Sequence, residues 1–329
     1  MRISMNCSMK TKLALFGALL AVAALLSLCA GASGVSLLTA IREPDSAAAR
    51  ILVHIRLPRV AAAMLSGAAL ACAGAIIQGV LNNPLAGPNI IGVNAGAGFM
   101  TLLCCWLFPA MVGLVPLAAF AGAMGTSLLI LLLVQRTGAS RLTVVLAGVA
   151  VSAILSAGSD LITTLAPEVT VGLTAFRVGG FSGVSGARVS QAAWYIVPGL
   201  AAALVLAGDL DVLALGDEVA QSVGLRVRRT RLLLLALAAL LAGAAVSFSG
   251  LIGFVGLMVP HIIRRLNGGE HKTLLPLSML GGAALMLLCD TIARTAFSPY
   301  ELPVGILLSL GGGPFFLLLL LKQRKGEAE

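Results

Sequence analysis

The chain has 329 residues, of which 59% are hydrophobic and only 11% are charged. Soluble domains usually carry about 25% charged residues, so the composition excludes a water-soluble enzyme and predicts a polytopic membrane protein. The net charge of +9 is typical of a membrane protein that gathers Lys and Arg in its cytoplasmic loops, and no nucleic-acid partner is expected. Because the apolar segments are long and unbroken, the expected fold class is all-α.

Apolar runs long enough to cross a bilayer, about 20 residues each, follow one another along the chain. The first follows Lys10 and Lys12 and imitates a signal peptide, but its length favours a retained membrane helix. Ser247 to Gly250 should break a stretch that is too long for one crossing. The sequence therefore predicts ten spans, at about 13–33, 59–81, 90–108, 114–134, 142–165, 190–208, 231–249, 252–263, 274–296 and 304–321.

The basic residues support this count. Ten spans with both termini in the cytoplasm place 15 of the 22 Lys and Arg residues on the cytoplasmic side, as the positive-inside rule requires. Three stretches would then face water: 34–57 and 166–190 on the outer side, and 209–230 on the inner side. No stretch resembles a separate soluble domain, so residues 1–329 are expected to form one transmembrane domain.

The inner stretch 209–230 carries the features of a short helix. Asp217 and Glu218 suit the N-terminal end of a helix dipole, and Gly224 suits its C-terminal end. The stretch is either a basic loop that obeys the positive-inside rule or a helix that docks a cytoplasmic partner, and we favour docking. The chain has no Gly-x-x-x-x-Gly-Lys-Ser/Thr loop to bind ATP phosphates. Any ATP must therefore be bound with its Mg²⁺ and hydrolysed by a separate polypeptide.

Several short strings, weak one by one, form a specific combination from about Arg50 to the last predicted helix. They are Arg56-Leu-Pro-Arg59, Gly67 to Gly79, Asn82 to Pro88, Gly92 to Gly98, Gly250 to His261, Asp290 to Arg294, Glu301 to Gly305 and Gly312 to Phe316. Together these strings resemble the FecCD-type permeases, subunits of ABC importers for iron–siderophore complexes, heme and vitamin B12. The order Glu218-x-Ala220-x-x-x-Gly224 also resembles the loop by which such permeases hold their ATPase.

This resemblance implies a type II importer architecture with ten helices per subunit. It implies a second permease subunit, two cytoplasmic ATPase subunits and a binding protein on the outer side, all at the cell inner membrane. The cargo would be a large metal chelate, a ferric siderophore first, then heme or vitamin B12. Closed two-fold symmetry favours a homodimer, although some members of the family pair two related permeases.

The resemblance also implies roles for individual residues. A turn would close the cytoplasmic end of the pathway, although Asn and Pro are ordinary turn residues. Arginines at outer helix ends would meet acidic groups of the binding protein, or else anchor to lipid headgroups. The residues concerned are Asn83 and Leu85 for the gate, Arg56, Arg59 and Arg294 for the binding protein, and Asp217, Glu218, Ala220 and Gly224 for the ATPase.

Two acidic residues lie inside predicted spans, where an ionisable side chain is a functional candidate. Asp290 and Arg294 are spaced i, i+4 and can pair on one helix face, so a structural role is favoured for Asp290. Asp160 sits mid-helix in the fifth span and either lines a water-filled pathway or reaches its outer end. An ion-coupled secondary transporter is the alternative function, but it needs coupling charges at the midplane and only Asp160 qualifies.

Neither catalytic residues nor a metal site is predicted. The six cysteines have no metal-binding spacing, and those inside apolar segments behave as small hydrophobic residues. His261 would be a heme ligand or, as we favour, a helix-end residue that meets backbone carbonyls. The chain itself is therefore expected to bind no cofactor.

Overall fold

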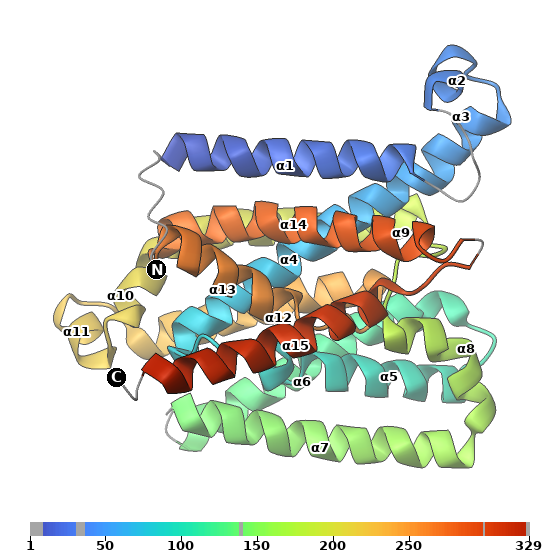
Figure 1. Cartoon of the computed structure of the whole chain (residues 1–329). Coiled ribbons are helices and arrows are strands. Elements are labelled where there is room, and N and C mark those ends of the chain that lie inside the picture. The colour runs from blue at the N-terminus through green and yellow to red at the C-terminus, as the bar shows by residue number, and fades with distance from the viewer. Residues whose placement is uncertain (1–8, 31–36, 138–140, 299, 327–329) are drawn as a thin grey trace.

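The computed structural model describes residues 9–30, 37–137, 141–298 and 300–326. Within these residues all regular secondary structure is helical, with turns and loops between the helices. Its long helices lie side by side in one bundle (Figure 1). One helix lies on each predicted span. These ten helices are α1 (Met9–Cys29), α4 (Leu57–Leu81), α5 (Val93–Leu107), α6 (Val115–Thr137), α7 (Arg141–Leu165), α9 (Gly186–Val205), α12 (Val227–Ser249), α13 (Val255–Asn267), α14 (His271–Thr295) and α15 (Val304–Gly326).

Length and apolarity by themselves support fewer crossings than the ten helices. Six helices meet both criteria: α1, the continuous helix 47–81, α6, α7, α12 and α14. Helix α9 meets them only together with α10 (Ala207–Ala214), against which it is bent by 53°. Helix α5 and the part Val304–Leu319 of α15 are apolar but shorter, and α13 has 13 residues. The short helices are those that pack against longer ones, which is where a membrane protein tolerates incomplete spans.

Both outer stretches that the sequence predicts as exposed loops contain helix. Residues 47–81 form one helix, in which α3 (Ala47–Ile51) and a π-helical turn at Leu52–Arg56 precede α4. A further short helix, α2 (Leu37–Arg42), comes before it. The second stretch contains α8 (Pro167–Val178), where Pro167 suits a first turn and Gly179, at φ +82°, ends the helix. Charged residues hid these helices from a hydropathy pattern.

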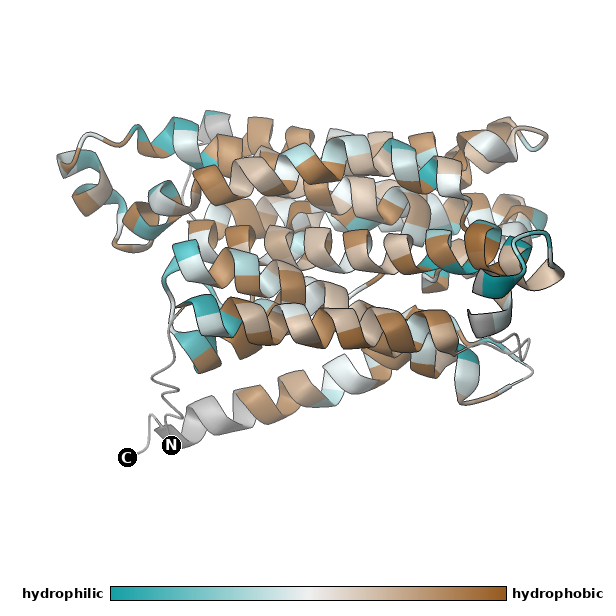
Figure 2. Cartoon of the chain, turned by 90° about the horizontal axis from the view of Figure 1, so that it is seen from above, coloured by the Kyte–Doolittle hydropathy of each residue, from teal (hydrophilic) through white to brown (hydrophobic). Residues whose placement is uncertain are grey.

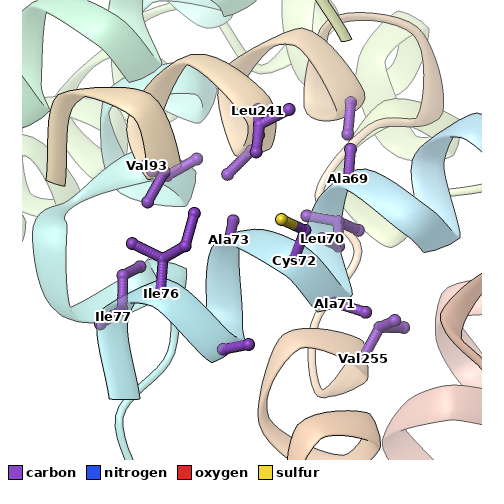
Figure 3. Packing of buried hydrophobic residues seen from close by; sticks show 14 of the residues in the cluster. Ala69, Leu70, Ala71, Cys72, Ala73, Ile76, Ile77, Val93, Leu241 and Val255 are labelled. Atoms are coloured by element: carbon purple, nitrogen blue, oxygen red, sulfur yellow. The ribbon is translucent and has the colours of Figure 1, made fainter. Parts of the chain in front are cut away.

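Helix α4 runs through the middle of the bundle (Figure 1). In its most apolar window 78% of the residues are buried, and it packs on α14, α12, α13 and α9. Small residues permit this packing: a Cβ on Gly67 would collide with the backbone of Gly282, and one on Gly74 with the backbone of Gly256. Figure 3 shows Ala69, Ala73, Ile76 and neighbouring side chains of α4 enclosed by the surrounding helices. Close backbone approach at glycine is how membrane helices associate.

Apolar residues cover the middle of the bundle and hydrophilic residues gather at its two ends (Figure 2). One end holds α10 and α11 (Asp217–Ser222), together with the start of α1 and the end of α15 (Figure 1). The other end holds α2, α3 and α8. We call these the α11 end and the α2 end.

Candidate functional site

The predicted coupling residues form a compact unit at the α11 end. Asp217 begins α11 and accepts a hydrogen bond from the Arg231 guanidinium at 2.7 Å, which fixes α11 to α12. Ala220 is fully buried, whereas Glu218 is exposed. Gly224 takes a φ of +85°, which favours glycine because it lacks a Cβ. The predicted short helix and its glycine stop are thus confirmed, although helical structure begins earlier, at α10.

Exposed apolar side chains lie on and beside α11, where water would be expected. Val219 is within the helix and is 46% exposed, Leu215 precedes the Gly216 turn and is 68% exposed, and Val223 follows the helix and is 67% exposed. At the same end a surface hollow of about 530 Å³ is lined by Gln221, Leu225, Val227 and three arginines: Arg226, Arg228 and Arg229. Exposed apolar side chains at a polar end of a protein mark an interaction surface.

The predicted gate is a tight turn that follows α4. Asn82 ends the helix in the left-handed conformation, at φ +47°. Asn83 then accepts a hydrogen bond from the Leu85 backbone N–H on its Oδ1, at 2.9 Å, and another from the Ala86 N–H on its carbonyl oxygen. This local bonding is how Asn stabilises turns. The structure therefore gives Asn83 a definite part in shaping the turn that presents Leu85.

The gate turn is fixed to α13 through a buried glutamine. Gln78 donates from Nε2 to the carbonyl oxygens of Gly256 and Leu257, at 3.4 and 3.3 Å. Its Oε1 accepts a hydrogen bond from Arg264 at 3.0 Å. Its own carbonyl accepts from the Asn83 N–H. Because Gln78 and Arg264 are 186 residues apart, the sequence offers no sign of this pair.

A cavity of about 200 Å³ lies between the gate turn and the segment that connects α12 to α13. Its lining is largely backbone and apolar side chain. Phe254 stands in the left-handed region, at φ +66°, which is unusual for a bulky residue. Such strain gathers at functional sites. The lining includes Leu70, Leu85, Pro88, Ile252, Phe254 and Leu257.

A buried charge cluster lies toward the α2 end. Arg59 makes a two-pronged ion pair with Asp290, in which Nε lies 3.0 Å from Oδ2 and Nη2 lies 3.0 Å from Oδ1. It also pairs with Glu301 at 2.8 Å. The predicted i, i+4 pair of Asp290 with Arg294 is present at 3.7 Å, but Arg59 is the closer partner of Asp290. This cluster joins α4, α14 and the segment before α15.

The three predicted docking arginines are inside the protein rather than on its outer surface. Arg56, Arg59 and Arg294 are 4%, 8% and 4% exposed. Arg56 donates to the carbonyl oxygen of Leu28 at 2.7 Å, and Arg294 donates to the backbone carbonyl and the hydroxyl oxygen of Ser27. Guanidinium groups need such acceptors when they are buried. All three lie toward the α2 end, where their guanidinium groups already bind acceptors within this chain.

Asp160 lies near the end of α7 and not in its middle. It is five residues from Leu165, the last residue of the helix, and it is exposed on the outside of the single chain. The description of Asp160 as mid-helix was wrong, because the predicted span, 142–165, already ends only five residues beyond it. Its exposed position fits a pathway or an outer rim and does not fit a paired coupling site.

Among the described residues, no group of three or more His, Cys, Asp or Glu side chains could hold a metal ion. His261 is buried, and neither ring nitrogen has a hydrogen-bond partner there. The expected contact with helix-end carbonyls is therefore not found. The ring instead packs edge-on against Phe315, with centroids 6.2 Å apart.

Residues 19–322 match the model of the FecCD transport family. The chain belongs to the FecCD transport family. Relatives of this permease include the hemin transport system permease protein of Yersinia pestis, 39% identical over 281 residues, or 84% of each chain. An Fe(3+)-citrate import system permease protein of Bacillus subtilis is 38% identical over 82% of this chain and 81% of its own.

The fold agrees with a solved structure described as a metal-chelate type ABC transporter in an inward-facing conformation. The TM-score is 0.86 at 31% identity, and the match covers 94% of this chain and 98% of the other. The chain is thus an ABC importer permease, a multi-pass membrane subunit that is not itself catalytic. The resemblance predicted from short strings is confirmed over nearly the whole chain.

Proposed function

We propose that this FecCD permease forms the membrane pathway through which an ABC importer carries an iron chelate. Its similarity to the solved transporter along 94% of its length is the observation that carries the proposal. The cargo is proposed from the relatives, whose names specify hemin, Fe(3+)-citrate and, in Bacillus subtilis, an iron(3+)-hydroxamate. A ferric siderophore or ferric citrate stands first, hemin next and vitamin B12 last.

The pathway would lie between two copies of the chain. The cavity at the gate turn, about 200 Å³, is smaller than the roughly 300–1,000 Å³ of ordinary small-molecule sites. Meanwhile α7 leaves an apolar face open, in which Leu146, Val149 and Ile154 are 59%, 61% and 71% exposed. Asp160 lies along the same helix. A second copy facing α7 and α15 would enclose a wider passage, and Leu85 of each copy would close its inner end.

The α11 ends of the two permease copies would face the cytoplasm and receive the two ATPase subunits. The exposed side chains of Leu215, Val219 and Val223 offer an apolar surface to bury, and the adjacent arginines agree with a cytoplasmic location. ATP and Mg²⁺ would be bound by those ATPases. Both termini would then be cytoplasmic in the cell inner membrane, because the start of α1 and the end of α15 lie at this end (Figure 1).

The α2 end would receive the substrate-binding protein. Arg56, Arg59 and Arg294 remain our candidates for this contact, but an acidic group of the partner would have to compete with Asp290 and Glu301 for Arg59. Glu301 is the partly exposed member of the cluster, with 36% of its side chain accessible. Docking would therefore rearrange this cluster rather than fill an empty positive site, and it would weaken as salt rises.

Reconstitution in liposomes tests the function. The permease, its ATPase and its binding protein are supplied with ⁵⁵Fe as ferric citrate, hemin or a ferric hydroxamate. We expect one complex to be taken up only when Mg-ATP is present on the side of the membrane that carries the ATPase subunits. Vanadate should stop this uptake. Liposomes without the ATPase, but with a proton or sodium gradient, are the control. Uptake in that control would establish the secondary-transporter alternative, and uptake of none of the three complexes would reject an iron cargo.

A further inference from the structure

Helix α10 holds the start of α14 by a single carboxylate. Asp211 Oδ1 accepts a hydrogen bond from the backbone N–H of His271 at 2.6 Å and lies 2.8 Å from the Nδ1 of the same residue. A carboxylate at a helix N-terminus satisfies an unpaired N–H and favours the helix dipole. The contact with Nδ1 also fixes the plane of the imidazole ring.

The ring that Asp211 orients lies against the last turns of α4. A Cβ on Gly79 would be 2.6 Å from His271 Nε2 and 3.0 Å from a methyl group of Leu210 on α10. The His271 side chain is 4% exposed, and its Nε2 has no hydrogen-bond partner among the described residues. A buried nitrogen without a hydrogen-bond partner costs free energy. Nε2 therefore does not favour this orientation of the ring. Asp211 and close packing on Gly79 determine it.

The gate turn begins immediately beyond this contact. Gly79 is followed within three residues by Asn82, and Asn83 shapes the turn that presents Leu85. On its other side the same turn of α4 is held by Gln78 and Arg264 of α13. The end of α4 is therefore fixed between α13 and the paired elements α10 and α14.

We propose that Asp211 and His271 are positioning residues that transmit movement of the α10–α11 unit to the end of α4 and so to the gate turn. The proposal rests on the proposed function, in which α11 contacts the ATPase. Movement of α11 would carry α10 with it, because only Leu215 and Gly216 separate the two helices. Asp211 would then move the imidazole, and Gly79 would follow because no free space separates it from the ring.

The test compares ATP hydrolysis with transport in the reconstituted importer, supplied with whichever ⁵⁵Fe complex the wild type takes up. Asp211→Ala and His271→Ala should leave ATP hydrolysis close to wild type but lower iron uptake about tenfold, a typical loss for one hydrogen bond to a charged group. Asp209→Ala, on the same helix, is the matched control and should not change the ratio of ATP hydrolysed to iron transported.

A second comparison tests whether the loss runs through the contact between Gly79 and the imidazole ring. Gly79→Ala should lower uptake in the wild type, because its methyl group meets the imidazole, but should lower it much less in a His271→Ala background, where only the methyl group of Leu210 still lies close to it. This non-additivity is the sign of direct coupling. Gly125→Ala on α6, where a Cβ would meet nothing within 4 Å, controls for the substitution itself.

Two results would overturn the proposal. One is an Asp211→Ala importer that keeps the wild-type ratio of ATP to iron, and the other is additive losses from Gly79→Ala and His271→Ala. If Asp211→Ala does not assemble, Asp211→Asn, which keeps an acceptor oxygen but loses the charge, takes its place in the same measurement. A wild type that transports no iron complex with its ATPase would reject the proposed function and not this contact, so the two failures are distinguishable.

Discussion

Helices α4 and α7 are equally apolar but differ sharply in burial. Their most apolar windows have mean hydropathies of 2.1, within the helix 47–81 that contains α4, and 2.0 for α7. Yet 78% of the first window is buried inside the chain, against 17% of the second. In a membrane protein, high hydropathy shows that a segment avoids water. Lipid tails exclude water as well as a protein interior does. Apolarity therefore located both helices without indicating which is central.

Close backbone contacts on several sides of the helix mark the difference. Gly67, Gly74 and Gly79 bring α4 against α14, α13 and the His271 ring. On α7, Gly148 and Gly158 make close contacts only on the side that faces Ile90 and Phe99. Helix α4 also carries Arg59, whose charge is tolerated at depth because Asp290 meets it there. A central helix is thus recognised by small residues and by paired charges.

The largest expected effect comes from removing the paired charge of α4. Arg59→Leu leaves Asp290 buried with only the more distant Arg294, and breaking a buried pair from one side costs about 3–5 kcal/mol. We expect a large fall in the midpoint of thermal unfolding in detergent and poor yield. Arg177→Leu, an exposed arginine on α8, is the control. Adding Asp290→Asn should recover part of the loss, and no recovery would contradict the pairing.

A smaller effect is expected from crowding α4. Gly74→Ala places a methyl group on the backbone of Gly256, so α4 and α13 must separate at a cost of about 1–3 kcal/mol. The melting midpoint should fall measurably, and the Gln78 contacts next to the gate turn should weaken. Gly125→Ala should be neutral or slightly stabilising, because alanine favours a helix over glycine. Equal midpoints for the two variants would mean that the helices adjust without strain.

The smallest effect is expected on the exposed face of α7. Ile154 is 71% exposed, so Ile154→Ala should change the stability of one chain by less than about 0.5 kcal/mol. The same substitution should loosen the association of two copies, which native mass spectrometry in detergent can measure. A stability loss comparable to that of Gly74→Ala would show that this face is already covered within one chain.

Much of the fold could be predicted because single-residue chemistry determines it. Apolar runs and the distribution of basic residues located the ten helices, and glycines at positive φ, such as Gly224 and Gly250, ended helices where expected. Helix α8 was missed because its 12 residues are too few for a membrane span and include Glu168 and Arg177. Asp160 was wrongly placed in the middle of its helix, although the predicted span itself ends only five residues beyond it.

The site was less predictable because its contacts join distant segments. Arg59 and Asp290 are 231 residues apart, and Asp211 and His271 are 60 apart. Each residue can be recognised as unusual in an apolar chain, but the sequence pattern does not pair it. The exception is Asp290 with Arg294, where helix periodicity predicts a contact. Even there the pattern did not indicate the closer partner of Asp290, because the guanidinium of Arg59 comes from another helix.

The π-helical turn at Leu52–Arg56 makes the α2 end unusually tolerant of a change in chain length. A π-turn accommodates one residue more than regular α-helical winding does, so deletion of one residue within it would restore regular winding. Because an α-helix turns by roughly 100° per residue, the same deletion elsewhere in the helix 47–81 would rotate everything before it about the helix axis relative to α4. Within the turn the change is absorbed, so Arg50 and α2 would keep their direction and Arg59 would keep its partners. A deletion of one residue here would therefore leave both the α2 end and the core of the protein in place.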